Sequence, residues 1–245
     1  MIRIEGVRIA FGRTPLLDGV DLAIPRGARF GIIGPAACGK TVLLKLICGL
    51  LRPDAGRIVV GGDEVTALSE PELMRVRQRI GMLFQNYALF DFMTVEQNVA
   101  FPLVRRGDLP PDAIATRVRE RLRAVGLAGS EGKFPAELSG GMKKRAGIAR
   151  ATVARCDLVL YDEPTAGLDP VTTSKIYDLL RADHAETGAT VVAVSSDVAA
   201  LCRFTDQVAM IYDGAVRYCG PSTAIADAAD PVVRQFVRGE LEGPL

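Results

Sequence analysis

The segment Gly34-Pro35-Ala36-Ala37-Cys38-Gly39-Lys40-Thr41 constrains the fold more than any other part of the 245-residue chain. It matches the pattern G-x-x-x-x-G-K-[ST], with an apolar predicted strand, Phe30 to Ile33, before it and a helical run, Lys40 to Leu50, after it. Backbone N–H groups in such a loop, together with the positive end of the following helix, bind phosphate groups. We therefore expect Lys40 to reach the β- and γ-phosphates of a nucleotide and the Thr41 hydroxyl to bind Mg²⁺.

The composition favours a folded protein and excludes several classes of partner. Hydrophobic residues make up 49% of the chain and the formal net charge is +1, so a sizeable core is expected and disorder is not. Basic and acidic residues are interspersed, which gives no electrostatic footprint for nucleic acid or an anionic membrane surface. The N-terminus lacks the apolar core of a signal peptide, and no run approaches the ~18 apolar residues of a membrane span. If the protein serves a membrane, a partner must hold it there.

The five cysteines form no pair with C-x-x-C spacing. We interpret them as small buried hydrophobic residues in a protein of a reducing compartment, with Cys38 set apart by its position in the glycine-rich loop.

Apolar runs and turn signals predict alternating strands and helices. This alternation implies a mainly parallel sheet covered by helices, in an α/β domain. Asp213-Gly214 between two apolar runs predicts a two-residue hairpin. Residues 1–245 are expected to form one domain, with a helical subdomain at approximately 86–150 inserted into it and one or two short helices in the tail at approximately 221–245. The remaining predicted strands are Ile2–Phe11, Leu16–Ile24, Arg57–Val60, Ile80–Phe84, Leu158–Tyr161 and Thr190–Val194, and the predicted helices are Val95–Val104, Asp112–Val125 and Pro170–Glu186.

A buried strand that ends in two acids is the second feature with chemical meaning. Leu158 to Tyr161 is apolar and leads directly into Asp162 and Glu163. In a nucleotide-hydrolysing enzyme with this phosphate loop, the first acid helps to hold Mg²⁺ and the second polarises the attacking water. Because strands end in polar turns for other reasons too, this pattern alone leaves the functional and the structural interpretation open.

A third segment, Leu138-Ser139-Gly140-Gly141-Met142, leads into an apparently helical stretch. Ser139 at a helix start followed by two glycines exposes backbone donors at the positive end of the helix dipole. The alternative is an ordinary capped helix after a loop.

The order of these segments resembles that of ABC transporter ATPases, and the resemblance covers essentially the whole chain. It implies a P-loop ATPase fold with a mainly parallel sheet core, an N-terminal antiparallel β subdomain and an inserted helical subdomain. It implies that two copies bind two ATP molecules between them, each site combining the phosphate loop of one copy with the Leu-Ser-Gly-Gly segment of the other. The segments that carry the resemblance are Gly34–Thr41, Gln85, Leu138–Gly141, Leu158–Glu163 and Gly167–Asp169.

The resemblance also assigns roles to single residues. It implies catalytic roles for Lys40, Gln85, Glu163 and Ser196, and Mg²⁺ contacts from Thr41, Gln85 and Asp162. Phe11 falls where an aromatic side chain stacks on adenine, although a core phenylalanine is the alternative. The nucleotide contacts that it implies are Phe11, Gly34, Pro35, Ala36, Ala37, Cys38, Gly39, Lys40, Thr41, Val42, Ser139, Gly140, Gly141, Met142 and Asp169, with Asp169 acting across the dimer interface.

Within the family, Met142 and the segments Met82–Phe90 and Asp230–Phe236 are similar to the MlaF-type ATPases. That resemblance implies transport of phospholipid with an MlaE-like permease and an MCE-domain lipid-binding protein. The chain would then lie at the cytoplasmic face of the inner membrane, attached through the permease. A docking groove for the permease and the small core of the helical subdomain are the two alternatives for the apolar residues after Gln85, which are Tyr87, Leu89, Phe90, Phe92 and Met93.

The chain departs from the family pattern in two places. Ala36 and Ala37 stand where the family usually has Ser and Gly, and an Ala37 in the left-handed conformation would be strained by about 1–2 kcal/mol. Ser196 stands where the family carries its switch histidine, and a serine is shorter and cannot carry charge. The only histidine, His184, is expected to be a solvated residue of a helix.

Three other functions stay open at this point. The chain could serve an importer for a polar solute, or act as a slowly hydrolysing switch that dimerises on ATP. A soluble ABC ATPase that acts on ribosomes or DNA would be expected to show two cassettes, a long coiled-coil insertion or basic surfaces, and none of these is visible.

Overall fold

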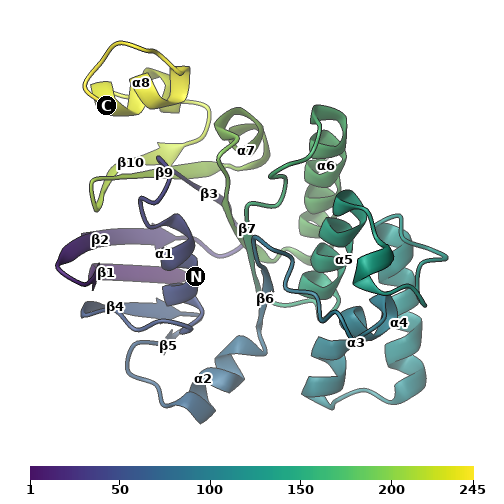
Figure 1. The fold of residues 1–245 in the computed structure, drawn as a ribbon. Helices are drawn as coiled ribbons and strands as arrows, with labels where there is room; N and C mark the ends of the chain where they lie inside the picture. The colour runs from purple at the N-terminus through teal and green to yellow at the C-terminus, as the bar shows by residue number, and fades with distance from the viewer. The chain divides into compact units, whose positions relative to one another are not determined.

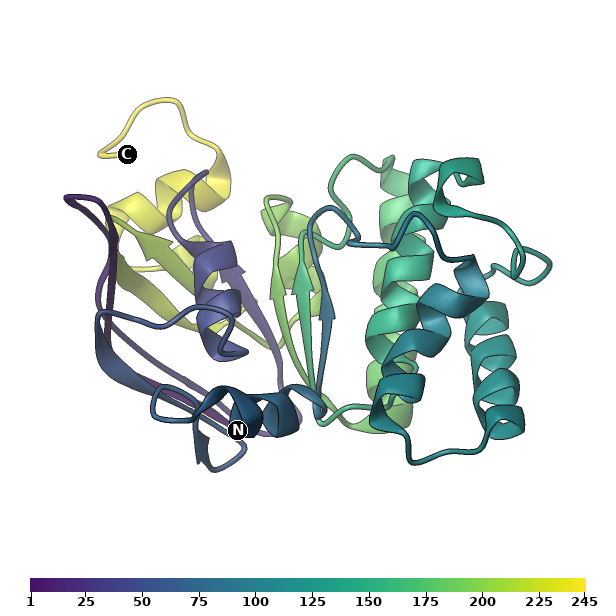
Figure 2. The ribbon, with the colours of Figure 1, turned by 60° about the horizontal axis from the view of Figure 1, so that its bottom comes forward.

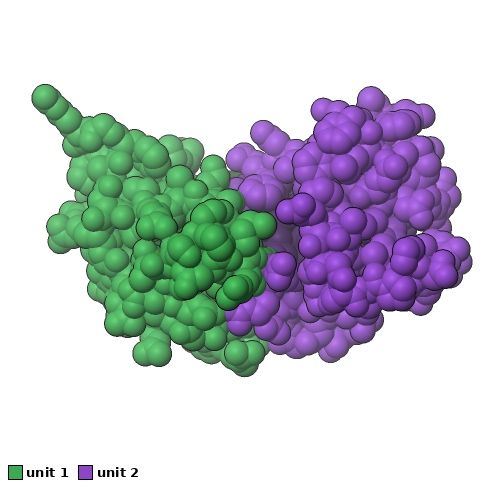
Figure 3. Space-filling model, turned by 90° about the horizontal axis from the view of Figure 1, so that it is seen from below, with its two compact units in different colours: residues 1–77, 190–245 green, residues 78–189 purple.

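The computed structural model describes residues 1–245, and the chain divides into two compact units (Figure 3). Unit 1 comprises residues 1–77 and 190–245, and unit 2 comprises residues 78–189. None of the helices combines the length and the hydropathy that crossing a bilayer requires.

Unit 1 contains a four-stranded sheet in the order β2-β1-β4-β5. β1 (Ile2–Phe11) pairs antiparallel with β2 (Thr14–Ile24) and with β4 (Ala55–Val60), and β4 pairs with the short β5 (Asp63–Glu64). Side chains of β1 alternate between the core and solvent, as a half-buried strand requires. The predicted antiparallel N-terminal portion is confirmed.

The parallel strands of unit 1 are arranged around β3 (Arg29–Ile33), which carries the phosphate loop at its end. β3 pairs in parallel with β8 (Thr190–Val194) on one side and with β9 (Gln207–Tyr212) on the other. β9 turns at Asp213-Gly214 into the antiparallel β10 (Ala215–Pro221). Both turn residues have positive φ, 50° and 73°, so the hairpin predicted from Asp213-Gly214 is confirmed.

The helices of unit 1 include one that is shorter than predicted and two that were not predicted. α1 begins at Lys40 but ends at Ile47, because Gly49 is left-handed (φ 65°) and the Leu50 N–H donates to the Lys45 carbonyl 2.8 Å away, which closes the helix. The sequence pattern predicted no helix over residues 65–79 or 198–204, where α2 and α7 lie. The helices of unit 1 are α1 (Lys40–Ile47), α2 (Glu70–Arg77), α7 (Val198–Phe204), a 3₁₀ turn (Ile225–Asp227) and α8 (Pro231–Arg238).

Unit 2 contains two paired parallel strands and a group of helices (Figure 1, Figure 2). β6 (Ile80–Leu83) pairs with β7 (Leu158–Asp162), and all five residues of β7 are buried. A Cβ at Gly81 of β6 would lie 1.9 Å from the Ala151 carbonyl oxygen of α5, so this glycine allows the helix backbone to rest directly on the strand. The helices are α3 (Val95–Arg106), α4 (Pro111–Ala124), a 3₁₀ turn (Pro135–Glu137), α5 (Gly140–Thr152) and α6 (Pro170–Thr187).

Capping residues fix where these helices begin and end. Thr94 and Gln97 form a reciprocal capping box at the start of α3, and Gly107 ends this helix in the left-handed conformation. The apolar faces of α3, α4 and α5 then form one core, which includes Val99, Leu122 and Ala146. The predicted helical stretch is therefore present, while its boundaries at 86–150 as a separate subdomain remain a prediction.

The prediction of buried cysteines holds for Cys48 and Cys156 and is wrong for Cys202 and Cys219, while Cys38 stands apart from it in the glycine-rich loop. Cys48 and Cys156 are buried, Cys38 and Cys202 are half-buried, and Cys219 is exposed. Cys219 lies on β10, whose only strand partner in unit 1 is β9 and where residues alternate between partial burial and exposure, so an apolar run did not imply burial there. His184 on α6 is half-buried rather than fully solvated.

Candidate nucleotide site

The phosphate loop lies between β3 and α1 in unit 1, and two of its glycines are required by the backbone. Gly34 has φ 148°, and a Cβ there would lie 2.2 Å from the carbonyl oxygen of Ile211. Gly39 has φ 101°, and a Cβ there would lie 2.8 Å from Leu17 Cδ2. A larger residue at Gly34 would collide with the backbone of β9, and one at Gly39 would be strained by the positive φ and would press on a side chain of β2.

Lys40 folds its side chain back over this loop. Its Nζ donates to the carbonyl oxygens of Gly34 and Pro35, at 2.8 Å each, and the residue is 9% exposed. Cys38 Sγ lies 3.9 Å from the same ammonium group, and burial raises the pKa of the Cys38 thiol. The Lys40 ammonium group and the backbone N–H groups at the start of α1 therefore lie at the same loop. A positive charge beside helix N-terminal N–H groups is the arrangement that binds phosphate.

Ala37 is strained, as its replacement of the usual glycine suggested. Its φ is 60°, in the left-handed region, whereas the neighbouring Ala36 has no positive φ; both side chains are exposed. A left-handed alanine costs about 1–2 kcal/mol relative to the right-handed conformation.

Ala37→Gly should therefore raise the free energy of unfolding by up to about 1 kcal/mol, because relief of strain exceeds the extra entropy that glycine gives the unfolded chain. Ala36→Gly is the matched control and should lower it by about 0.5 kcal/mol, since only the entropy term applies. Urea unfolding without nucleotide measures both. A shift of the same sign in the two variants would show that the Ala37 backbone is not strained in solution.

Two further predicted residues of unit 1 lie at the surface. Phe11 at the end of β1 is 57% exposed, which excludes the core alternative; adenine stacking stays a prediction. Ser196 is exposed and lies two residues after the end of β8, between the buried Ser195 and the exposed Asp197, which caps α7.

The two acids lie in unit 2 at the end of β7 and differ in environment. Asp162 is the last residue of the strand and is 2% exposed. Glu163 is half-buried and left-handed, with φ 52°. A left-handed glutamate is uncommon, and strained residues of this kind persist where the surrounding structure holds them, often at functional sites.

Two helix starts in unit 2 carry the remaining predicted nucleotide contacts. Ser139 caps α5, its Oγ accepting from the Met142 N–H at 3.3 Å, so Gly140 and Gly141 form the first turn. Asp169 caps α6 and accepts hydrogen bonds from the Thr172 N–H and hydroxyl, which hold the pKa of this carboxyl below its usual value. Because its pKa is lowered, the Asp169 carboxyl is ionised at neutral pH, and the residue is exposed.

Gln85 is exposed in a turn that begins two residues after the end of β6. The next residues are fixed from α5, because Arg150 donates to the carbonyl oxygens of Tyr87 at 2.7 Å and Ala88 at 2.6 Å. Tyr87 and Ala88 both have positive φ, 62° and 49°. The buried Arg150 therefore fixes the backbone of the segment after Gln85.

Sequence reasoning missed three buried polar residues that organise unit 2. Lys144 and Arg150 of α5 and Asn98 of α3 are at most 9% exposed. Asn98 accepts from the Phe90 N–H and donates to three carbonyl oxygens between residues 90 and 94. A signal for Lys144 exists, because it shares the helical spacing of the buried Gly147, Ile148 and Ala151, but it lies in a basic triplet, a pattern typical of a solvated helix face.

The predicted residues thus fall into two groups. Unit 1 holds Phe11, the loop from Gly34 to Val42, and Ser196. Unit 2 holds Gln85, Ser139, Gly140, Gly141, Met142, Asp162, Glu163 and Asp169.

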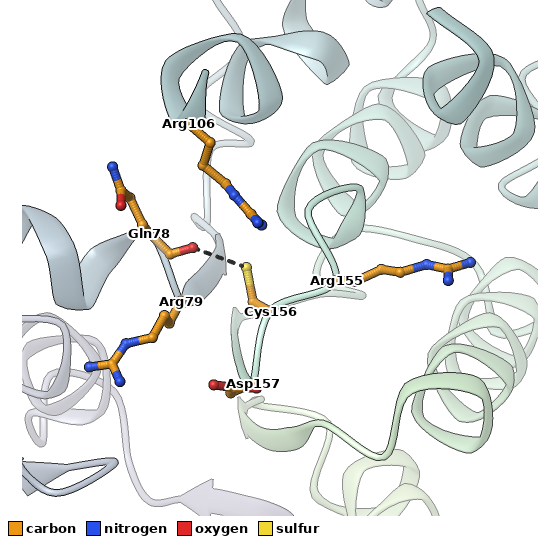
Figure 4. A pocket seen from close by; sticks show the side chains of 6 residues that line it. All are labelled: Gln78, Arg79, Arg106, Arg155, Cys156 and Asp157. Carbon is orange, nitrogen blue, oxygen red and sulfur yellow. Dashed lines mark hydrogen bonds between the residues drawn. The ribbon is translucent and has the colours of Figure 1, made fainter. Parts of the chain in front are cut away.

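A separate cavity of about 250 Å³ in unit 2 contains none of these residues (Figure 4). Two of its arginines form ion pairs, Arg106 with Asp108 and Arg155 with Glu186. Figure 4 shows Arg79 and Arg155 extending away from Cys156. Burial raises the pKa of the Cys156 thiol to about 11, so it is protonated at neutral pH. The lining residues are Gln78, Arg79, Arg106, Arg155, Cys156 and Asp157.

The three side chains that the sequence predicts as Mg²⁺ ligands carry donor atoms of the kind that this ion prefers. No group of three or more His, Cys, Asp or Glu side chains forms a metal cage in the chain. Thr41, Gln85 and Asp162 offer hydroxyl, amide and carboxylate oxygens, the hard ligands that Mg²⁺ prefers, and Mg²⁺ characteristically takes few protein ligands and completes its shell with phosphate and water.

Comparison with protein families gives a match over residues 17–166 to the family described as ABC transporter. Three curated proteins are similar over nearly the whole chain. The probable ribonucleotide transport ATP-binding protein mkl of Mycobacterium leprae is 39% identical over 244 residues, 100% of this chain and 70% of that protein. MlaF, the intermembrane phospholipid transport system ATP-binding protein of Escherichia coli K12, is 38% identical over 245 residues, 100% of this chain and 91% of MlaF. The methionine import ATP-binding protein MetN of Caulobacter vibrioides is 42% identical over 235 residues, 96% of this chain and 70% of MetN.

Among solved structures, the fold is similar to that of the ATP-binding cassette MJ0796, in a dimeric post-hydrolysis state bound to ADP and Pi. The TM-score is 0.85 at 31% sequence identity, covering 91% of this chain and 99% of that one.

Proposed function

Since the chain belongs to the ABC transporter family and is an ATP-hydrolysing subunit of such a transporter, we propose that it powers phospholipid transport through a membrane-spanning permease similar to MlaE. The observation that carries the nucleotide chemistry is the phosphate loop, in which the Lys40 ammonium lies against the loop carbonyls at the start of α1. The support for phospholipid is the alignment with MlaF over 245 residues, which includes the segments Met82–Phe90 and Asp230–Phe236.

We assign the steps of hydrolysis to the residues as follows. Lys40 and the N–H groups of the loop bind the β- and γ-phosphates, and Phe11 stacks on the adenine. Thr41, Asp162 and Gln85 would hold Mg²⁺, which neutralises charge on the phosphates. Glu163 orients and polarises the attacking water.

The partner that completes each site is a second copy of this chain. Ser139, Gly140 and Gly141 present backbone donors at the start of α5, a second phosphate-binding arrangement. The similar cassette MJ0796 is dimeric with ADP and Pi bound. In the proposed dimer, the Ser139 segment of one copy contacts the γ-phosphate held by the loop of the other, with Met142 and Asp169 beside it.

The proposed permease contact lies on the segment after Gln85. Leu89, Phe90 and Met93 were expected to supply it if exposed, but all three are half-buried. Leu89 packs against the helical core, and the Phe90 ring centroid lies 4.9 Å from that of Phe101. Phe92 is the exposed residue, at 75%, with its ring centroid 5.8 Å from that of Phe90. A chain with a net charge of +1 has little attraction for lipid headgroups, so an apolar docking point of this kind would hold it at the cytoplasmic face of the inner membrane.

Phe92→Asp should abolish co-purification with the permease, because a carboxylate would be desolvated in an apolar contact. Nucleotide binding by the isolated subunit should stay unchanged. Val104→Asp, on α3 and 59% exposed, is the matched control and should keep the permease bound. Retention of the permease by Phe92→Asp would place the docking surface elsewhere.

The cargo is tested with the subunit reconstituted together with the permease and any MCE-domain protein that co-purify with it. We expect ATP-dependent transfer of fluorescent phospholipid between vesicles and no ATP-dependent uptake of methionine or ribonucleotides, the solutes in the names of the other relatives. Uptake of a polar solute without phospholipid transfer would favour the importer function and overturn the lipid proposal.

A second candidate function, a slowly hydrolysing dimerisation switch, is favoured by Ser196 alone. If Ser196 occupies the γ-phosphate position, Ser196→His should raise the turnover number, because an imidazole reaches further and can carry charge, and Ser196→Ala should lower it. Ser174→His, an exposed position on α6, is the control for an added histidine. If neither change at Ser196 alters steady-state hydrolysis, another group makes the γ-phosphate contact.

A further inference from the structure

Lys144 is the most deeply buried charged side chain of unit 2, and nothing in the proposed hydrolysis uses it. It is 1% exposed and lies in α5, one turn after Gly140 and Gly141. Burial lowers the pKa of this ammonium group, and the negative charge of Glu163 opposes that shift. Because burying an ammonium group is costly without hydrogen bonds, the partners of Lys144 indicate what the residue is for.

Those partners belong to the segment that follows β7. Lys144 Nζ donates to the carbonyl oxygen of Glu163 and to that of Ala166, each at 3.0 Å. The same ammonium group lies 5.2 Å from the ring centroid of Tyr87, in the segment after Gln85. One side chain of α5 therefore contacts both segments that the proposed hydrolysis needs in unit 2.

The contact with Glu163 bears on a strained backbone. Glu163 is left-handed, and the hydrogen bond across its turn, from the Ala166 N–H to the Glu163 carbonyl oxygen, is long at 3.4 Å. Two donations from Lys144 at 3.0 Å fix the carbonyl oxygens at both ends of this turn. Strained residues persist only when surrounding contacts determine them, and Lys144 supplies two such contacts here.

We propose that Lys144 is a positioning residue, which holds the backbone of Glu163 so that its carboxylate is aimed at the attacking water. This rests on the proposed role of Glu163 in ATP hydrolysis. Lys144 lies in α5, the helix that Ser139 caps, and Ser139 contacts the nucleotide of the other copy in the proposed dimer. A shift of α5 when that nucleotide binds would therefore move the Glu163 backbone, and so link the two ATP sites of the dimer.

The test compares Lys144→Met, which keeps length but removes the donors, with Lys144→Gln, which keeps an amide with two N–H donors. Lys144→Met should lower kcat for ATP hydrolysis about tenfold or more, while KM and the Kd for ATP change less than about threefold. Lys144→Gln should recover part of kcat. Lys143→Met, the neighbouring half-buried lysine, should match the wild-type protein.

A double variant separates positioning from a general structural effect. If Lys144 acts through Glu163, adding Lys144→Met to Glu163→Gln should not reduce the residual turnover further. Full activity of Glu163→Gln alone would instead refute the proposed role of Glu163 itself. If Glu163→Gln is inactive, two results would overturn the role of Lys144. One is a wild-type kcat in Lys144→Met, and the other is a further multiplicative loss of turnover in the double variant. If Lys144→Met does not fold, a Lys144→Gln variant with lowered kcat and unchanged Kd supports the proposal, and one with wild-type kcat or a raised Kd overturns it.

Discussion

Glu163→Gln is expected to lower the turnover number for ATP hydrolysis by about 10²–10⁴-fold, the range lost when a positioned acid or base is removed. Glutamine keeps the size and one hydrogen-bond acceptor but cannot polarise water with a negative charge. ATP binding should persist, because the phosphate contacts of Lys40 are untouched. The variant should therefore accumulate as an ATP-bound dimer with twice the chain mass of 26.2 kDa.

Steady-state phosphate release and light scattering with and without ATP measure the two parts of this result. Glu186→Gln, on α6 and paired with Arg155 at 2.6 Å, is the control for loss of a carboxylate in the same unit. Unchanged hydrolysis in Glu163→Gln would contradict the assignment of the water-polarising group.

Lys40→Ala should act at the binding step instead. Removal of one partner of a hydrogen-bonded charge pair costs about 2–5 kcal/mol, which corresponds to a Kd for ATP raised by roughly 30-fold or more. Truncation also frees the carbonyl oxygens of Gly34 and Pro35, which then face the phosphates without an ammonium group between them.

Isothermal titration with ATP measures this loss, and Lys45→Ala on the same helix is the matched control. Lys45 has no contact with the loop in the proposed site, so its variant should keep the wild-type Kd. A Lys40→Ala variant that binds ATP with wild-type affinity would show that the loop binds phosphate through its backbone alone.

Local patterns predicted most strands and helices, because alternation and turn residues act over short distances. β1 begins and ends where the apolar alternation does, and the Asp213-Gly214 hairpin follows from the positive φ that both residues adopt. The end of α1 was missed because the capping conformation at Gly49 interrupts a run that is still apolar in sequence.

The spacing of the phosphate loop and the acids located the chemical groups, but it could not show how they are held. The buried partners of Lys144 and Arg150 are backbone carbonyl oxygens, 19 to 63 residues away in the chain. Backbone oxygens are present at every residue, so no side-chain pattern marks such contacts. The left-handed conformation of Glu163 is equally invisible in sequence, since it depends on its surroundings rather than on the residue type.

The central claim is that ATP is hydrolysed at sites shared between two copies of this chain, and mixing two inactive variants tests it most directly. Lys40→Ala disables the phosphate loop, and Ser139→Arg blocks the start of α5. Each variant alone should be nearly inactive, because both sites of its dimer contain the defect. In a mixed dimer, both defects fall in one site and the other site combines an intact loop with an intact Ser139 segment. The mixture should therefore regain a substantial part of wild-type hydrolysis, whereas a mixture no more active than its components would contradict the shared site.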